Sequence, residues 1–309
     1  MSALESALKT SLDELRMQML GVQVLFGFQL QGLFQDTFRE LPSSIRIVDA
    51  TALALTISVL TLLLAVPCQH RIVEQGEASL RIFRLSMRYA NYALFPLGAV
   101  ISCDIYTATR QSFGSAKSVA LASITFLIAL GAWYGAGMYF RRHDDQQRGD
   151  SPVQETKTTL HAKIEQLLTE ARVILPGAQA LLGFQLVVMM TRAFRELPPG
   201  AQSIHLIALV SLMLAVVLLI TPAAIHRLAF EGLDDPRLHA MGSRIIAFAL
   251  LPMICAIACD VWVALFRLGG GSIVPDVGAL MTACLLVGFW YVLPLVVRLR
   301  IHSRHVDHE

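Results

Sequence analysis

Two aspartates in long apolar segments are the residues of this sequence best suited to do chemistry. Asp104 and Asp260 each follow a cysteine directly and a proline by eight positions. A carboxylate at membrane depth is costly unless it is paired or faces water, and a carboxyl group withdrawn from water holds a proton more tightly. Each aspartate is therefore a candidate site for a proton or small cation. The alternative is a structural ion pair with Arg39 and Arg195, which the duplicated register of these arginines favours.

The two aspartates are equivalent positions of an internal repeat. Shifted by 156 positions without a gap, Glu14–Asp104 overlays Glu170–Asp260. The identical residues include polar ones, such as the Phe-Arg-Glu-Leu-Pro segment that occurs once in each copy. A shared apolar pattern alone would not retain polar side chains, so the two copies are predicted to share one polar architecture.

Glutamines in the first apolar segment of each copy form the second candidate group. Gln23 and Gln29 recur as Gln179 and Gln185. A spacing of six residues places the two side chains about 120° apart around a helix, so they cannot share one narrow face. A side-chain amide at membrane depth needs a hydrogen-bond partner. These glutamines either join neighbouring helices or line a polar path, and glycines repeated at the same spacing favour helix contact.

The composition is that of an integral membrane protein. Of the 309 residues, 55% are hydrophobic and only 16% are charged, and the mean hydropathy is +0.59. A soluble protein carries about a quarter charged residues. Apolar blocks at or near membrane-spanning length occupy 45–66, 118–140, 204–221 and 281–297. The net charge of +2 and the absence of a basic patch predict no nucleic-acid partner.

The predicted fold is an all-α integral membrane protein with eight transmembrane helices, arranged as two parallel four-helix repeats. The predicted helices are 17–38, 45–67, 88–109 and 118–140 in the first copy, and 173–194, 204–222, 245–266 and 273–297 in the second. Most lysines and arginines fall on the side of both termini, so the positive-inside rule predicts cytoplasmic termini in the inner membrane. Four crossings per copy then give both copies the same orientation.

The chain divides into a first membrane repeat at 1–142, a polar cytoplasmic linker at 143–169 and a second membrane repeat at 170–309. Leucine and isoleucine residues at helical spacing precede the first apolar segment of each copy. They are Leu4, Leu8, Leu12 and Leu15 before the first copy, and Leu160, Ile164, Leu167 and Leu168 before the second. These segments are either amphipathic helices on the membrane surface or cytoplasmic extensions of the first spanning helix.

A further set of repeated charged residues flanks the predicted inner ends of the helices. Its members are Glu14, Arg71, Arg88, Glu170, Arg227 and Arg244. Their opposite charges predict a cytoplasmic network that ties the helix ends together. The alternative is a basic pocket for the headgroups of anionic lipids.

The sequence contains no GxSxG, HExxH or Walker motif, so we expect neither enzymatic activity nor a cofactor. The five cysteines lie in or at the ends of apolar segments and predict neither disulfides nor a metal site. His302, His305 and His308 near the C-terminus have no fourth ligand nearby, so we expect no metal there either.

The segment Leu175–Leu186, followed by Arg195-Glu196-Leu197 and His226-Arg227, resembles a bacterial family of small four-helix membrane proteins of unknown function. Members of that family are sometimes labelled sodium:proton antiporters. The resemblance implies that this chain is a tandem fusion of two family units. It also implies that Asp104 and Asp260 are the first carboxylates to test.

Two functions fit the sequence. The first is a proton- or cation-coupled transporter that uses the two aspartates, with the glutamines lining its path. The second is a membrane scaffold or sensor in which the same residues are purely structural. Membrane lipids, and for the first function a proton or small cation, are the expected partners, and an oligomer is compatible with either function.

Overall fold

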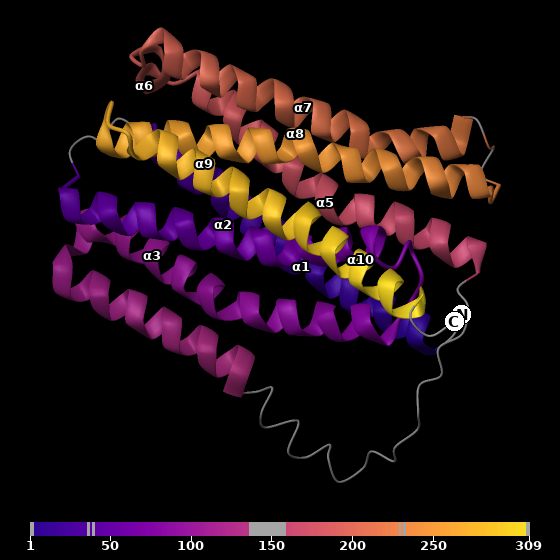
Figure 1. Cartoon of the computed structure of the whole chain (residues 1–309). Coiled ribbons are helices and arrows are strands. Elements are labelled where there is room, and N and C mark those ends of the chain that lie inside the picture. The colour runs from indigo at the N-terminus through magenta and orange to yellow at the C-terminus, as the bar shows by residue number, and fades with distance from the viewer. Residues whose placement is uncertain are drawn as a thin grey trace.

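The structure is a computed structural model that describes residues 3–35, 38, 41–135, 159–228, 230 and 233–306. All regular secondary structure in these residues is helical. The elements are α1 (Ala3–Gly32), α2 (Ser43–Ile72), α3 (Leu80–Leu130), η2 (Gly131–Gly135), α5 (Leu160–Met189), α6 (Arg192–Arg195), α7 (Pro199–Leu228), α8 (Pro236–Gly269), α9 (Val274–Val287), η3 (Gly288–Val292) and α10 (Leu293–Val306). The long helices run side by side along a common direction (Figure 1).

Side-chain caps fix where several helices begin. The hydroxyl groups of Ser79 and Thr159 accept hydrogen bonds from backbone N–H groups three residues later. The carboxylate of Asp235 accepts from the N–H of Arg237, and Pro236 occupies the first turn of α8, where a missing N–H has no cost. Helices α3, α5 and α8 thus start upstream of the apolar segments that the sequence marks most clearly.

Six helical segments in the described part of the chain are long and apolar enough to cross a membrane. They are Ser43–Ile72, Phe113–Gly135, Leu160–Met189, Pro199–Arg227, Pro236–Gly269 and Val274–Ile301. The sequence predicted eight. The two further predicted spans, 17–38 and 88–109, overlap helices α1 and α3 but are not among the six.

The predicted third and fourth helices of the first copy are two helical arms of α3 that meet directly at Gly114. Gly114 interrupts α3 with φ 78° and ψ 172°, a conformation that costs glycine little and other residues much. The two arms of α3 run back along each other on either side of this glycine (Figure 1). A sharp bend at one glycine therefore replaces the loop that the sequence predicted between 109 and 118.

Both copies contain the same π-helical turn in their last helix. Gly131–Gly135 and Gly288–Val292 are related by a shift of 157 positions, and each contains a Trp-Tyr pair. The hydroxyl group of Tyr134 donates to the carbonyl oxygen of Asn91 at 2.8 Å. The hydroxyl group of Tyr291 donates to that of Ala247, the residue equivalent to Asn91. One insertion after the aspartates therefore hides this part of the repeat from an ungapped comparison.

The helices that open the two copies, α1 and α5, pack against each other along their length. The leucines at the start of α1 are almost fully buried, and α1 and α5 run unbroken from Ala3 and Leu160. The segments interpreted as either surface helices or extensions are therefore extensions. Residues 160–169, assigned to the linker, belong to α5, and 143–158 lie outside the described residues.

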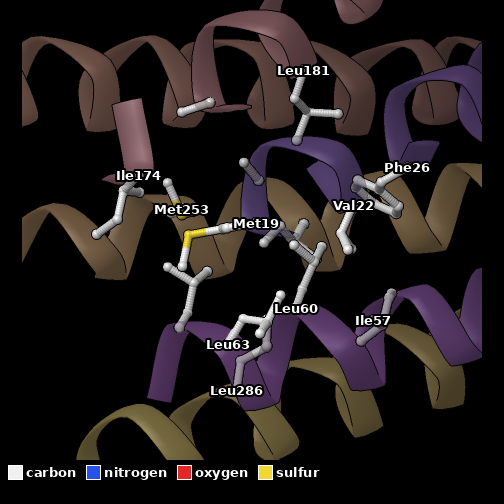
Figure 2. Packing of buried hydrophobic residues seen from close by; sticks show 14 of the residues in the cluster. Met19, Val22, Phe26, Ile57, Leu60, Leu63, Ile174, Leu181, Met253 and Leu286 are labelled. Atoms are coloured by element: carbon white, nitrogen blue, oxygen red, sulfur yellow. The ribbon is translucent and has the colours of Figure 1, made fainter. Parts of the chain in front are cut away.

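The core lies where α1 meets helices of both copies (Figure 2). Met19, Val22 and Phe26 of α1 are fully buried. Their neighbours in this cluster come from α2, α5, α8 and α9, as Leu60, Ile174, Leu181, Met253 and Leu286 illustrate (Figure 2). Helix α1 therefore lies in the core, packed against α2, α3 and α5, and its polar residues must be satisfied by neighbouring helices.

Equivalent residues of the two copies meet at both ends of the α1–α5 contact. Lys9 lies 2.5 Å from Glu165, and the rings of Phe28 and Phe184 have centroids 4.7 Å apart. A Cβ atom at Gly27 would lie 1.9 Å from the ring of Phe184. Gly27 therefore permits the close approach that the repeated glycines predicted.

Candidate functional site

Asp260, on α8, is enclosed and has two polar partners. Its Oδ2 accepts a hydrogen bond of 2.6 Å from Nε2 of Gln185 on α5. Its Oδ1 lies 3.8 Å from Nδ1 of His205 on α7. Asp260 is 1% exposed and His205 is 3% exposed. The space around them is about 10 Å³, which is barely room for one water molecule.

His205 brings its own proton to this cluster. Its Nε2 lies 3.1 Å from the carbonyl oxygen of Gln185, and because that oxygen only accepts, Nε2 must carry a proton. A second proton between Nδ1 and the carboxyl group of Asp260 would make the pair neutral overall, whichever of the two groups holds it. The second copy therefore places a titratable partner beside its buried aspartate.

Asp104, on α3, makes the equivalent bond in a different setting. Its two oxygens accept from Nε2 of Gln29 on α1 at 3.1 and 3.3 Å. Asp104 is only partly buried and lines a cavity of about 410 Å³ between α1, α2 and α3, with Leu268 of α8 in its wall. A second carboxylate, Asp49 of α2, lines the same cavity.

Asp49 and His205 occupy equivalent positions of the repeat, 156 residues apart. The two copies thus share the glutamine and the aspartate but differ in the third polar residue. One copy places two carboxylates at an open cavity, and the other pairs a carboxylate with an imidazole in a closed space. Two carboxylates at one cavity favour binding a proton or another cation between them.

The predicted arginine partners do not meet the aspartates where the structure describes them. The side chain of Arg195 is exposed, and its guanidinium group donates to the carbonyl oxygen of Met190 at 3.5 Å. Arg39 lies outside the described residues. Arg46 and Arg267, near the cavity, donate to the carbonyl oxygens of Leu41 and Leu33. Within the described residues, Asp49 and Asp104 have no basic ion-pair partner.

The four predicted glutamines have three different environments. Gln29 and Gln185 bind the aspartates of a neighbouring helix, as described above. Gln23 is 4% exposed and packs against Gly177, at which a Cβ would lie 1.4 Å from the Oε1 of Gln23. Gln179 is exposed. Helix contact thus accounts for Gln23, while Gln29 both joins two helices and lines the cavity.

Part of the predicted cytoplasmic network forms one buried cluster between the copies. The two carboxylate oxygens of Glu170 on α5 bind Nδ1 of His70 and the guanidinium group of Arg71, both at the end of α2. Arg71 also donates to the hydroxyl group of Ser243 on α8 at 3.0 Å. The remaining members, Glu14, Arg88, Arg227 and Arg244, are exposed. The network is therefore a single asymmetric contact rather than two equivalent ones.

Sequence reasoning missed Asp49 and His205 because it relied on identical residues. Each is a charged or titratable residue at the same position of an apolar segment, and that was the available signal. In the described part of the chain, no group of three or more His, Cys, Asp or Glu residues is placed to hold a metal ion. The side chains of the C-terminal histidines lie outside the described residues.

The long apolar helices and the all-helical fold fit a membrane protein. The chain belongs to a family of unknown function (DUF6328), whose model matches residues 4–136 and again residues 154–294. Each match spans one copy of the repeat, consistent with a tandem duplication of the family unit. No curated protein and no solved structure matches the chain significantly.

Proposed function

We propose that the protein crosses the inner membrane eight times, as two parallel four-helix copies with both termini in the cytoplasm. The contacts between Lys9 and Glu165 and between Phe28 and Phe184 support parallel copies. Each joins a residue to its own counterpart, and the two are 19 positions apart, about 28 Å along a helix. If the pseudo-two-fold axis that relates the copies ran across the helices, equivalent residues would meet at one point only. An axis that runs along the helices brings equivalent residues together along their whole length.

The arrangement of the chain ends supports the same topology. The described starts of α1 and α5 and the ends of α2, α7 and α10 lie at one end of the molecule (Figure 1). His70-Arg71 and His226-Arg227 are in the last turns of α2 and α7. Basic residues gathered at one end predict that this end is cytoplasmic.

We propose further that the first copy binds a proton or small cation for coupled transport. The observation that carries this proposal is the cavity shared by Asp49 and Asp104. Asp104 carries the exchangeable cation, Gln29 holds the carboxyl group in place, and Asp49 raises the affinity for positive charge by proximity. Such a residue at membrane depth is a candidate for an ion pathway.

Replacing Asp104 by asparagine is therefore expected to abolish coupled flux. Purified protein in liposomes with an internal pH dye would be given a sodium, potassium or proton gradient. The variant D104N should reduce the flux to that of protein-free liposomes, because the amide cannot exchange a proton or balance a cation. The matched variant D260N should retain flux, because Asp260 is enclosed with His205.

The second candidate function is a scaffold or sensor without transport. The closed Gln185–Asp260–His205 cluster favours it, because such a cluster stabilises helix contacts and exchanges nothing with solvent. Wild-type flux in D104N would remove Asp104 from any transport mechanism, and absence of flux in the wild-type protein would favour the scaffold. The variant R39Q completes the test. If Asp104 and Arg39 form a structural ion pair, R39Q and D104N should lower the thermal stability of the protein by similar amounts.

A further inference from the structure

We propose that the cavity of the first copy binds a hydrophobic organic cation, and that His205 takes the place of this cation in the second copy. The inference rests on the proposed function, because it names the class of ligand that the same site takes. Four features of the structure support it: the size and lining of the cavity, its charge, the arrangement at the equivalent position of the repeat, and a buried acceptor without a partner.

The cavity has the size and lining of a small-molecule site. Its volume of about 410 Å³ falls within the range of sites for organic ligands, about 300–1,000 Å³. Most of its lining residues are apolar, among them Leu25, Phe28, Leu53 and Leu268. An apolar body with one positive group fits both the walls and the carboxylates.

The charge of the cavity selects a cation. Asp49 and Asp104 are both in its lining, and neither has a basic ion-pair partner in the part of the chain that the structure describes. Arg46 and Arg267 lie near the cavity, but their guanidinium groups are held on backbone carbonyl oxygens. Two carboxylates that share one low-dielectric space repel each other, and a bound cation relieves this repulsion.

The second copy displays how the same residues accommodate a nitrogen-bearing group. There the carboxylate of Asp260 faces the His205 imidazole, and the main chain of Gln185 accepts from it. The ring of Phe194 lies 5.2 Å from the imidazole, centroid to centroid. In the second copy, an aromatic, nitrogen-bearing side chain thus stands at the position that the smaller side chain of Asp49 has in the first copy. Asp104, Gln29 and Phe38, the counterparts of Asp260, Gln185 and Phe194, line the cavity of the first copy.

A buried hydrogen-bond acceptor lies at the cavity without a partner in the described structure. Gln29 donates its amide to Asp104, and its Oε1 is buried without a partner in the described structure. Oε1 of Gln185 is likewise unpartnered, but the space of about 10 Å³ around it is too small for an organic ligand. A buried acceptor without a donor is unfavourable, so an N–H or polarised C–H group of a ligand entering the cavity of the first copy would be stabilised there.

Binding of tetraphenylphosphonium to the purified full-length protein in detergent tests this inference. Equilibrium dialysis of the radiolabelled cation should give one saturable site per chain. D104N should weaken binding about 10- to 100-fold, the range for losing a charge-assisted contact. D49H, which copies the second half of the molecule, should abolish binding while the protein remains folded, as judged by gel filtration and thermal melting.

The control is D276N, because Asp276 is an exposed carboxylate of the second copy outside the cavity. It should bind as the wild type does, which separates the site from attraction to carboxylates in general and from partition into detergent. D49N distinguishes loss of the carboxylate from the added imidazole and should bind more weakly than wild type but more tightly than D49H.

The possible results separate the two proposals. Saturable binding that depends on Asp104 and is lost in D49H supports the inference. Ion flux without tetraphenylphosphonium binding, or binding unchanged in both D104N and D49H, overturns the ligand class, and the first of these leaves the proposed transport intact. Binding without any ion flux supports the site and contradicts ion-coupled transport.

Discussion

Replacing Glu170 by glutamine is expected to lower the free energy of unfolding by about 3 kcal/mol or more. Glu170 is 2% exposed, and its partners His70 and Arg71 are 0% and 8% exposed in their side chains. The amide keeps the shape of the side chain but removes the negative charge that balances the guanidinium group. An uncompensated buried cation then remains between the copies, and this is the costly outcome when one partner of a buried pair is lost.

The repeat supplies the control for this prediction. Glu14 is the counterpart of Glu170 but is exposed, so Glu14→Gln should change stability by less than about 0.5 kcal/mol. Both variants would be followed by reversible unfolding in mixed micelles. Equal effects of the two substitutions would contradict a single asymmetric cluster. A stability gain in Glu170→Gln would mean that the pair is not formed.

Replacing Trp290 by alanine should be the second most damaging change, with a loss of about 2–4 kcal/mol from the cavity that it leaves. Trp290 is fully buried, and its indole N–H donates to the carbonyl oxygen of Thr61 on α2 at 3.2 Å. This contact joins the last helix of the second copy to the first copy. In lipid the loss arises from packing rather than from hydrophobic transfer, because the surroundings are apolar in any case.

Trp133 is the counterpart of Trp290 in the other π-helical turn, and it is only partly buried. It lies beside Gly98 within its own copy. Trp133→Ala should therefore cost clearly less than Trp290→Ala, and limited proteolysis should detect loosening of α9 and α10 only in the latter. The opposite ranking would show that the last helix of the first copy, not of the second, joins the two halves.

Much of the fold could be predicted because apolar blocks of spanning length dictate helices and because the repeat is visible in the identities. The direct junction between the third and fourth helices could not be predicted. A single glycine at φ 78° forms this turn, and the sequence around it resembles an ordinary linker. The shared π-helical turn was also hidden, since one inserted residue changes the shift from 156 to 157.

The candidate site was predictable in part. Retained polar residues pointed to Gln29 and Asp104 and to their counterparts, and the structure joins each pair by a hydrogen bond. A search for identical residues in the two copies cannot find Asp49 and His205, because the two copies carry different polar residues at this position. The proposed arginine pairing assumed that neighbours on one side of the membrane meet, whereas Arg195 of α6 contacts the backbone at the end of the preceding helix, α5.

The central claim is that the two copies are parallel and meet along their first helices. Two double-cysteine variants test it in a background without the five native cysteines: Lys9→Cys with Glu165→Cys, and Phe28→Cys with Phe184→Cys. A short thiol cross-linker should join both pairs within single chains in native membranes, because each pair lies on the axis between α1 and α5. Cross-linking of one pair but not the other would mean that the helices only cross, and parallel copies would be excluded.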